Sequence, residues 1–419
     1  MDYKNIFLSL LIAIGLSYNP AAQAMHQGLP YEQVPQIALF AAMGNVQGLQ
    51  QQLNFFDTAG EPFDLNQIYR FAGLHGTLLH FACCNSHTAV VKLLLNKGAN
   101  IEAQNDEHWT PLHLACQNGQ TDVVKLLLNN RANIEAQDNE HWTPLHFACH
   151  DGHAKVAKLL LNNHANIDAQ DNEHWTPLHL ACQEGYAKVV KLLLSNGANI
   201  EAQDNIQWTS LLLACQEGHA EVVKLLLDNG ANIENQTNEL RTPLHIACQG
   251  GHAKVVNLLL NNGANIKAEA MQKITTLHPA CFNGHVDVVL VLLKHQACFT
   301  AITEDGRTPV TVARQQNHHA LANFIEAFLA GECAIAYTDE PCSICMETFE
   351  EDALGIQLSC NHFFHHDCLK EWTKESPTCP LDRRETIVDV EEKTLCKKYV
   401  IIKKPTIAEP AQKSYRGLL

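Results

Sequence analysis

A cluster of cysteine, histidine and aspartate residues near the C-terminal end of the chain has the spacing of a metal site. Its candidate ligands are Cys342, Cys345, Cys360, His362, His365, Cys368, Cys379 and Asp382. Zinc takes thiolate, imidazole and carboxylate donors in closed, four-coordinate structural sites, so these side chains provide for two Zn²⁺ ions. A segment of about fifty residues without a large apolar core needs such metal ions to fold.

The identity of one ligand has an alternative. His366 is adjacent to His365 and could replace it, but the two residues that separate His365 from Cys368 match the usual ligand spacing and favour His365.

This ligand pattern resembles the RING finger of the two-histidine subtype, over residues 338 to 389. The resemblance implies an interleaved cross-brace, with Cys342, Cys345, His365 and Cys368 on one zinc ion and Cys360, His362, Cys379 and Asp382 on the other. Asp382 departs from the commoner cysteine, although some members that are ligases use aspartate at this place. We expect the second site to hold its zinc less tightly.

The resemblance also implies a function. RING fingers dock a ubiquitin-conjugating enzyme charged with ubiquitin and speed transfer to a substrate lysine by positioning, without covalent chemistry of their own. The docking positions of the family correspond here to Ile344, Trp372, Pro380 and Arg383. Arg383 stands where many active members carry a cation that bridges enzyme and ubiquitin, and its five donors suit that role. The alternative is a zinc-stabilised module without transfer activity, because a zinc motif by itself establishes only folding.

The residues that precede this module repeat with a period of 33. A threonine opens each unit, at positions 77, 110, 143, 176, 209, 242, 275 and 308. The unit TPLHxA, then VVKLLL, then GANI resembles the ankyrin repeat, with seven copies and a degraded eighth that starts at Thr308. The expected fold is therefore mainly α: an ankyrin-repeat solenoid followed by a small zinc-stabilised α+β RING finger.

The unit explains its own local structure. Pro111 suits the first turn of a helix, where its missing amide proton costs nothing, and Leu112, Leu114 and Ala115 form an apolar helix face. The second helix is apolar over most of its circumference, so neighbouring units must stack to bury it. Gly98, Gly197, Gly230 and Gly263 are expected to end second helices in the left-handed conformation, and Arg131 and His164 at this place predict strain of about 1 kcal/mol each.

Two sets of repeated side chains are candidates for function. The histidines of the TPLH box recur at one fixed place, which favours a local role as turn caps over metal binding; they are His80, His113, His146, His179, His245 and His278. The hairpin tips carry Trp109, Trp142, Trp175 and Trp208 on one edge of the stack. Packing of each indole on the next hairpin is the favoured explanation, and binding of a partner protein along this edge by these four residues is the alternative. His108, His141 and His174 occupy tip positions where the ankyrin pattern usually has glycine, which leaves the turn geometry open.

The expected domain organisation follows from these motifs. It comprises a signal peptide (1–24), an N-terminal capping ankyrin-like region (34–76), ankyrin repeats (77–330), the RING finger (338–389) and a lysine-rich tail (390–419). Segments from Ile37 and from Val310 are expected to cap the two ends of the solenoid.

Composition limits the partners and the cysteine chemistry. The net charge of −16 and the pI near 5.8 argue against nucleic acid as a partner. Seven of the 16 cysteines recur at the 33-residue spacing, and stacked helices keep equivalent positions about 8–10 Å apart, too far for disulfides. They are Cys83, Cys116, Cys149, Cys182, Cys215, Cys248 and Cys281, and we expect buried free thiols. No phosphate loop, dinucleotide fingerprint, HExxH or serine-elbow motif is present.

The first residues resemble a secretory signal peptide. Ile6 to Leu16 form an apolar run too short to span a bilayer, and the small-x-small site at Ala22 to Ala24 follows. Ubiquitin transfer takes place in a eukaryotic cytosol, and a protein exported by an intracellular bacterium into a host cytosol reconciles the two signals. A eukaryotic protein that faces the cytosol from an N-terminal membrane anchor is the alternative.

Two functional hypotheses remain. The leading one is a RING-type ubiquitin ligase, exported as an effector, in which the ankyrin stack holds a protein substrate and the RING finger brings the charged conjugating enzyme. The other is a non-enzymatic ankyrin scaffold with a structural zinc-binding RING finger.

Overall fold

The computed structural model describes residues 36–59, 63–71 and 74–329, with four short strands at 335–336, 355–357, 363–365 and 400–401. The chain divides into two compact units, one up to Asn205 and one from Ile206, and each is described by itself as the N-terminal and the C-terminal unit. The predicted signal peptide lies outside the described residues, as does most of the predicted RING finger.

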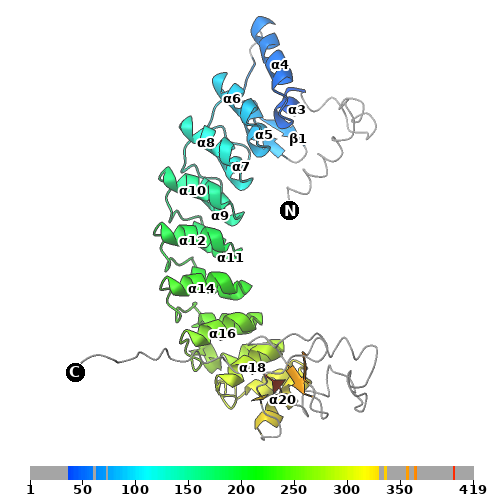
Figure 1. The fold of residues 1–419 in the computed structure, drawn as a ribbon, viewed down its shortest axis with the longest axis vertical. Coiled ribbons are helices and arrows are strands. Elements are labelled where there is room, and N and C mark those ends of the chain that lie inside the picture. Colours follow the sequence, from blue (N-terminus) through cyan, green and yellow to red (C-terminus); the bar gives the residue numbers. More distant parts are fainter. Residues whose placement is uncertain are drawn as a thin grey trace, which may run out of the picture. The chain divides into compact units, whose positions relative to one another are not determined.

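The N-terminal unit is a stack of helix pairs (Figure 1). Its pairs are α3 (Gln36–Ala42) with α4 (Val46–Ala59), α5 (Leu78–Cys84) with α6 (Thr88–Asn96), α7 (Pro111–Gln117) with α8 (Thr121–Asn129), α9 (Pro144–His150) with α10 (Ala154–Asn162), and α11 (Pro177–Gln183) with α12 (Ala187–Ser195). The first helices of consecutive pairs contact one another, and so do the second helices. An antiparallel hairpin of β1 (Tyr69–Phe71) and β2 (Leu74–Gly76) precedes α5. The segment predicted to cap the N-terminal end forms α3 and α4, and its capping role stays a prediction.

The C-terminal unit continues the same pattern. Its pairs are α13 (Ser210–Glu217) with α14 (Ala220–Asp228), α15 (Pro243–Gly250) with α16 (Ala253–Asn261), α17 (Leu277–Asn283) with α18 (Val286–Lys294), and α19 (Pro309–Gln315) with α20 (His319–Leu329). Before α17, β3 (Glu269–Ala270) and β4 (Ile274–Thr275) pair antiparallel across a short 3₁₀ turn, η2 (Met271–Lys273). The segment predicted to cap the C-terminal end of the stack lies in α19 and α20, and its capping role stays a prediction.

Four short strands form a separate sheet in the order β5-β8-β6-β7. They are β5 (Ile335–Ala336), β6 (Gly355–Gln357), β7 (Phe363–His365) and β8 (Val400–Ile401), and only β5 and β8 run parallel. Strand β8 lies within the predicted tail, so this sheet combines strands from both sides of the expected boundary at residue 389.

Five first helices, α5, α7, α9, α11 and α15, begin with the cap that the TPLH box predicts. Thr110 has extended backbone angles at the N-cap, Pro111 follows at the first helical position, and the backbone N–H of Thr110 donates to His113 Nδ1 at 2.9 Å. Because Nδ1 accepts, the ring proton is on Nε2, which donates at 2.9 Å to the carbonyl oxygen of Ala136, in the loop that follows α8. Burial lowers the pKa of His113 to about 4, so the ring is neutral at neutral pH. The predicted capping role of these histidines is confirmed.

The core of the stack consists of the apolar faces of both helices in each pair. In one repeat Leu112, Ala115, Val123, Val124 and Leu127 are no more than 1% exposed. The seven periodic cysteines are buried beside them, and all seven are free thiols, as the 33-residue spacing predicts. Burial raises the pKa of the Cys116 thiol well above its ordinary value, so this thiol is inert in the folded protein.

The turns show where the repeats depart from glycine. Gly98 ends α6 with φ of 88°, and Arg131 and His164 adopt φ of 66° and 67° at the equivalent place, which confirms the left-handed turn. The tip residues His108, His141 and His174 also have positive φ, 61° to 62°. The tips therefore keep the geometry that favours glycine although they carry histidine. Within the described residues, no helix combines the length and apolar character needed to cross a membrane.

Candidate partner-binding surfaces

The predicted RING residues lie almost entirely outside the described residues. Of the eight predicted zinc ligands only His365 is included, as the last residue of β7. The predicted docking positions Ile344, Trp372, Pro380 and Arg383 are not included, and the ligand set and docking roles stay predictions. Elsewhere in the described residues there is no cluster of three or more cysteine, histidine, aspartate or glutamate side chains that could hold a metal ion.

The tryptophans of the N-terminal unit form a ladder with aspartates of the following repeats. Trp109 Nε1 donates to Asp138 Oδ2 at 3.0 Å, and Trp142 Nε1 donates to Asp171 Oδ2 at 3.0 Å. Each pair spans 29 residues of sequence, so each bond joins neighbouring repeats. We call these four residues the Trp–Asp ladder.

Each aspartate of the ladder also shapes the next hairpin. Asp138 Oδ1 accepts the backbone N–H groups of Glu140 and Trp142, at 3.0 and 2.7 Å. Burial is the largest influence on Asp138 and raises its pKa, while these three donors act in the opposite direction. The carboxylate is thus fully used inside the stack.

The indole rings of the ladder pack on the repeat structure. Trp109 and Trp142 both make edge-to-face contacts with Phe147, at ring-centre distances of 4.9 and 5.2 Å. The rings are half-buried, as are those of Trp175 and Trp208. The packing that the sequence favours is therefore present at Trp109 and Trp142. Partner binding by the exposed parts of the four rings stays a hypothesis.

The hairpin edge of the C-terminal unit differs in its side chains. The position directly before the opening threonine holds Trp208, then Arg241, Ile274 and Arg307. At the position equivalent to Asp138 and Asp171, the middle repeat has Ala270. Ala270 and Ile274, which pair across one hairpin, are therefore both smaller than the aspartate and tryptophan of the Trp–Asp ladder.

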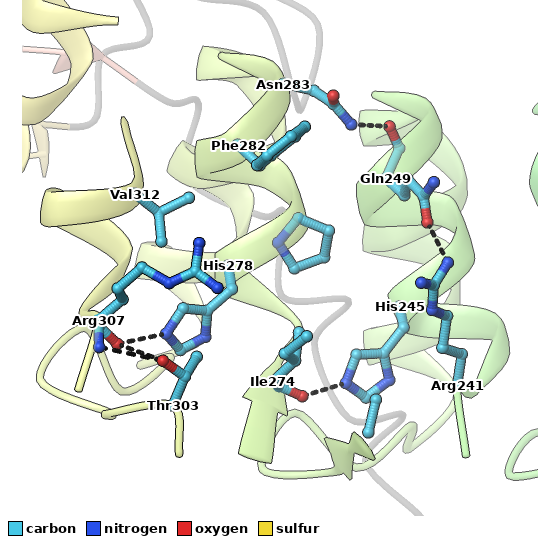
Figure 2. Close-up of a pocket in the computed structure, with 12 residues that line it drawn as sticks. Arg241, His245, Gln249, Ile274, His278, Phe282, Asn283, Thr303, Arg307 and Val312 are labelled. Atoms are coloured by element: carbon cyan, nitrogen blue, oxygen red, sulfur yellow. Dashed lines mark hydrogen bonds between the residues drawn. The ribbon is translucent and has the colours of Figure 1, made fainter. Parts of the chain in front are cut away.

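A pocket of about 280 Å³ lies at this edge, and we call it the arginine pocket (Figure 2). It is lined by Arg241, His245, Gln249, Ala270, Ile274, His278, Pro279, Phe282, Asn283, Thr303, Arg307 and Val312. Figure 2 shows Arg241 and Arg307 on opposite sides, with Ile274, His278 and Phe282 between them. The lining residues come from three consecutive repeats of the C-terminal unit.

The two arginines are the cations of this pocket. Burial lowers the pKa of His245 to about 4 and also lowers the pKa of His278, so both rings are neutral at neutral pH. His245 Nε2 is 3.1 Å from the carbonyl oxygen of Ile274, and His278 Nε2 is 3.3 Å from that of Arg307 (Figure 2). These two histidines hold the hairpins in place through their bonds to backbone carbonyl groups. The guanidinium groups of Arg241 and Arg307 are therefore the charged groups that a ligand would contact.

Sequence reasoning did not identify the arginine pocket. The signal in the sequence is a change of residue type at two positions of the repeat. The residue before the opening threonine changes from Trp to Arg, Ile and Arg, and the position of Asp138 and Asp171 becomes alanine at residue 270. Because the repeat motif is defined by the residues that recur, the positions at which the residue type changes belong to no motif.

Comparison with known proteins identifies both parts of the chain. The family described as "Ankyrin repeats (3 copies)" matches residues 39–138, 131–204 and 202–270, which together cover more than half of the chain. The family described as "Ring finger domain" matches residues 340–383. Among solved structures, the human ASB11 ankyrin repeat domain is 31% identical, with a TM-score of 0.48, and the match covers 52% of this chain and 96% of that domain.

The similar curated proteins match short segments. Human PHD and RING finger domain-containing protein 1 is 36% identical over 80 residues, which are 19% of this chain and 4% of that protein. The rat E3 ubiquitin-protein ligase RNF181 is 38% identical over 48 residues, 12% of this chain and 29% of the ligase. The RING-H2 finger protein ATL81 of Arabidopsis thaliana is 42% identical over 62 residues, 15% of this chain and 18% of that protein.

The chain thus spans less than a third of the length of each of these relatives. Its RING finger is similar to those of ubiquitin ligases, a class of domain that generally binds two zinc ions, and ankyrin repeats mediate protein interactions. The chain belongs to the ankyrin-repeat family and carries a RING finger domain near its C-terminal end.

Proposed function

We propose that this protein is a RING-type ubiquitin ligase whose ankyrin stack holds a protein substrate while its RING finger recruits a charged ubiquitin-conjugating enzyme. The observation that carries the proposal is the match of residues 340–383 to the RING finger family in a chain that also has a long ankyrin stack. Similarity to rat RNF181, whose name describes an E3 ubiquitin-protein ligase, supports transfer activity over a purely structural module.

The zinc ions have a structural role in this proposal. The donor set comprises five cysteines, two histidines and one aspartate, which suits two four-coordinate zinc sites and no redox chemistry. When bound, the two ions hold the fold of the RING finger. Asp382 contributes an oxygen where the other seven ligands contribute sulfur or nitrogen, so we expect its site to lose zinc first.

The protein residues then position the transfer without forming a bond themselves. Ile344, Trp372 and Pro380 provide apolar contacts for the conjugating enzyme, and Arg383 provides donors to the enzyme and to ubiquitin. These contacts restrain the ubiquitin thioester for attack by a substrate lysine. The lysine-rich tail, residues 390–419, offers lysines for self-modification when no substrate is bound.

We also propose that the protein is exported through its N-terminal segment and acts in the cytosol of a host cell. The apolar run from Ile6 to Leu16 and the small residues after it support export, while the RING finger needs the ubiquitin system of a eukaryotic cytosol. Sequencing of the mature N-terminus tests this proposal, since cleavage after Ala24 is expected and an intact Met1 would contradict it.

The test of ligase activity is ubiquitin-chain formation by the full chain with zinc, ubiquitin, a charging enzyme and a panel of conjugating enzymes. We expect chains that Ile344→Ala and Arg383→Ala reduce at least tenfold, because each variant removes a docking contact and keeps the zinc ligands. Ile68→Ala removes the same exposed side chain type from the ankyrin stack, where Ile68 is 43% exposed, and is expected to leave the rate unchanged.

A zinc measurement on each variant excludes misfolding as the cause. Folded protein with two zinc ions and no chains with any conjugating enzyme would contradict the ligase proposal and would support the ankyrin scaffold instead. Removal of zinc with a chelator is expected to abolish chain formation and leave the helical signal of the ankyrin stack in place.

A further inference from the structure

The arginine pocket lacks a carboxylate that the equivalent edge of the N-terminal unit supplies from within the stack. In the Trp–Asp ladder, the residue before each opening threonine donates to an aspartate 29 positions further on. The same step from Arg241 leads to Ala270, which has no acceptor and lines the pocket. The cation Arg241 thus stands where the ladder has a neutral tryptophan, and Ala270 stands where the ladder has the aspartate that accepts its hydrogen bond.

The guanidinium groups have donors to spare. Arg241 Nη2 pairs with Glu239 at 2.7 Å and Nη1 donates to Gln249 Oε1 at 2.9 Å. Arg307 Nη2 pairs with Asp305 at 2.6 Å, while its Nε is buried and has no hydrogen-bond partner. Glu239 and Asp305 are more than half exposed and are not among the residues that line the pocket. Since a guanidinium has five donors, both arginines can bind a further acceptor that enters the pocket.

Between the arginines the pocket is apolar. Ile274 replaces the larger indole found in the N-terminal unit, and Val312 contributes a further aliphatic surface. Phe282 is 47% exposed at one end of the pocket, where the preceding repeat has Gln249 (Figure 2). An exposed aromatic residue between two cations is a favourable contact for an apolar side chain with a carboxylate beside it.

The pocket suits the side chains of a peptide. Its volume of about 280 Å³, near the lower end of the range of about 300–1,000 Å³ that is typical of ligand sites, is enough for one or two side chains. It opens on the hairpin edge of a solenoid, where a polypeptide can run past several repeats.

We propose that the arginine pocket binds a segment of a partner protein in which an aspartate or glutamate stands beside a large aliphatic or aromatic residue. The carboxylate bonds to Arg241 or Arg307 in place of the missing aspartate, and the apolar side chain packs on Ile274 and Phe282. This inference deepens the proposed function and rests on it, because it names the recognition chemistry of the substrate that the ankyrin stack holds.

The test measures binding of fluorescent twelve-residue peptides to the full chain by fluorescence polarisation. The probe set has one Asp or Glu next to Leu, Ile or Phe within a Gly-Ser background, matched to peptides with Asn or Gln in place of the acid and to peptides with Ser in place of the apolar residue. We expect loss of the carboxylate or of the apolar side chain to weaken binding about tenfold each, the size of one charge-assisted hydrogen bond or one buried side chain.

Four variants locate the binding in the pocket. Arg241→Gln and Arg307→Gln are expected to remove the preference for the acid, and Phe282→Ser the preference for the apolar residue. Ala270→Asp supplies the missing carboxylate from within the stack and is expected to abolish binding although every arginine is kept. Lys224→Gln removes one exposed cation from the outer helix α14 and is the matched control, with unchanged affinity expected.

The inference is overturned if acidic and neutral peptides bind equally, if none binds to folded protein, or if Ala270→Asp binds as well as the native chain. Chain formation measured on the same samples separates this inference from the ligase proposal. Loss of peptide binding in Arg241→Gln with self-ubiquitination retained supports the pocket alone. Loss of ubiquitin transfer in Arg383→Ala with peptide affinity retained concerns the RING finger alone. Peptide binding by a protein that transfers ubiquitin with none of the conjugating enzymes would contradict the ligase proposal and would still support peptide binding by the arginine pocket.

Discussion

The hairpin edges of the two units differ in whether their polar groups are satisfied by the stack itself. In the N-terminal unit, Trp109 and Trp142 give their N–H groups to Asp138 and Asp171, which lie in the following repeats. In the C-terminal unit, Arg241 and Arg307 form ion pairs with exposed acids two residues away, Arg241 also donates to Gln249, and both arginines line the arginine pocket. The comparison indicates that one edge stabilises the repeats while the other keeps binding capacity available, although both derive from the same repeated unit.

Acidification is expected to lower stability more than any of the substitutions below, because it acts on the histidines of the TPLH box, which both units contain. The pKa values of His80, His113, His146 and His245 are lowered to about 4 from an ordinary value of 6.5, mainly by burial. Between pH 6.5 and 4 the unfolded chain binds more protons than the folded chain, so the stabilisation is complete above pH 6.5 and is lost as pH falls toward 4. Each ring accounts for about 3 kcal/mol at the acid end of this window.

Amide hydrogen exchange at pH 7 and pH 4.5 measures this loss repeat by repeat. His113→Leu copies the natural Leu212 of the repeat at Thr209 and is the control, since it lowers stability at pH 7 and makes the pH dependence shallower by one group. An unchanged pH slope in this variant would show that the histidine cap does not carry the acid sensitivity.

Removal of one indole from the Trp–Asp ladder tests the first half of the comparison. Trp142→Ala deletes the bond to Asp171 and the contact with Phe147, and it leaves a carboxylate oxygen of Asp171 without its donor. We expect a loss of about 2–3 kcal/mol in the free energy of unfolding. Arg241→Ala at the equivalent position is expected to cost less than about 1 kcal/mol, because its ion pair is exposed. Denaturant titration of both variants checks the difference, and equal losses would contradict a purely structural ladder.

A smaller change, a gain in stability, is expected at Arg131, where a residue with a Cβ takes the place of the turn glycine found in other repeats. Arg131 has φ of 66°, while Gly230 and Gly263 occupy the equivalent turn with φ of 88°. Arg131→Gly should raise stability by about 1 kcal/mol through relief of backbone strain. Thermal unfolding measures it, with Arg131→Ala as the control that removes the same side chain and keeps the strained Cβ. An equal gain in stability in Arg131→Ala would show that the effect comes from loss of the Arg131 charge and not from relief of backbone strain.

The smallest effect concerns the first repeat of the C-terminal unit, which lacks the proline of its neighbours. Ser210 takes the first helical position, and its buried hydroxyl has no hydrogen-bond partner. Ser210→Pro should stabilise the protein by about 0.5–1 kcal/mol, because proline restricts the unfolded chain and fits this position in five other repeats, for example as Pro177 and Pro243. Ser210→Ala separates removal of the hydroxyl from the restriction of the backbone. A proline variant no more stable than the alanine variant would contradict the backbone argument.

Much of the ankyrin stack could be predicted because its signals are local. Thr110, Pro111 and His113 lie within one helical turn, so their spacing fixes the cap. The buried cysteines and the left-handed turns follow from the same period. The zinc ligands are likewise a matter of spacing, and their geometry lies outside the described residues apart from His365 in β7.

The sequence by itself determined the repeat, its caps, the buried thiols and the presence of a RING finger, because each depends on residues within a few positions or on a fixed period. Only the tertiary structure decided which distant side chains meet. Trp109 reaches Asp138 in the next repeat, and the arginine pocket draws on three repeats. The pocket exists because Ala270 and Ile274 are smaller than the residues at the same positions of the N-terminal unit, and a missing volume becomes visible only when the neighbouring repeats surround it.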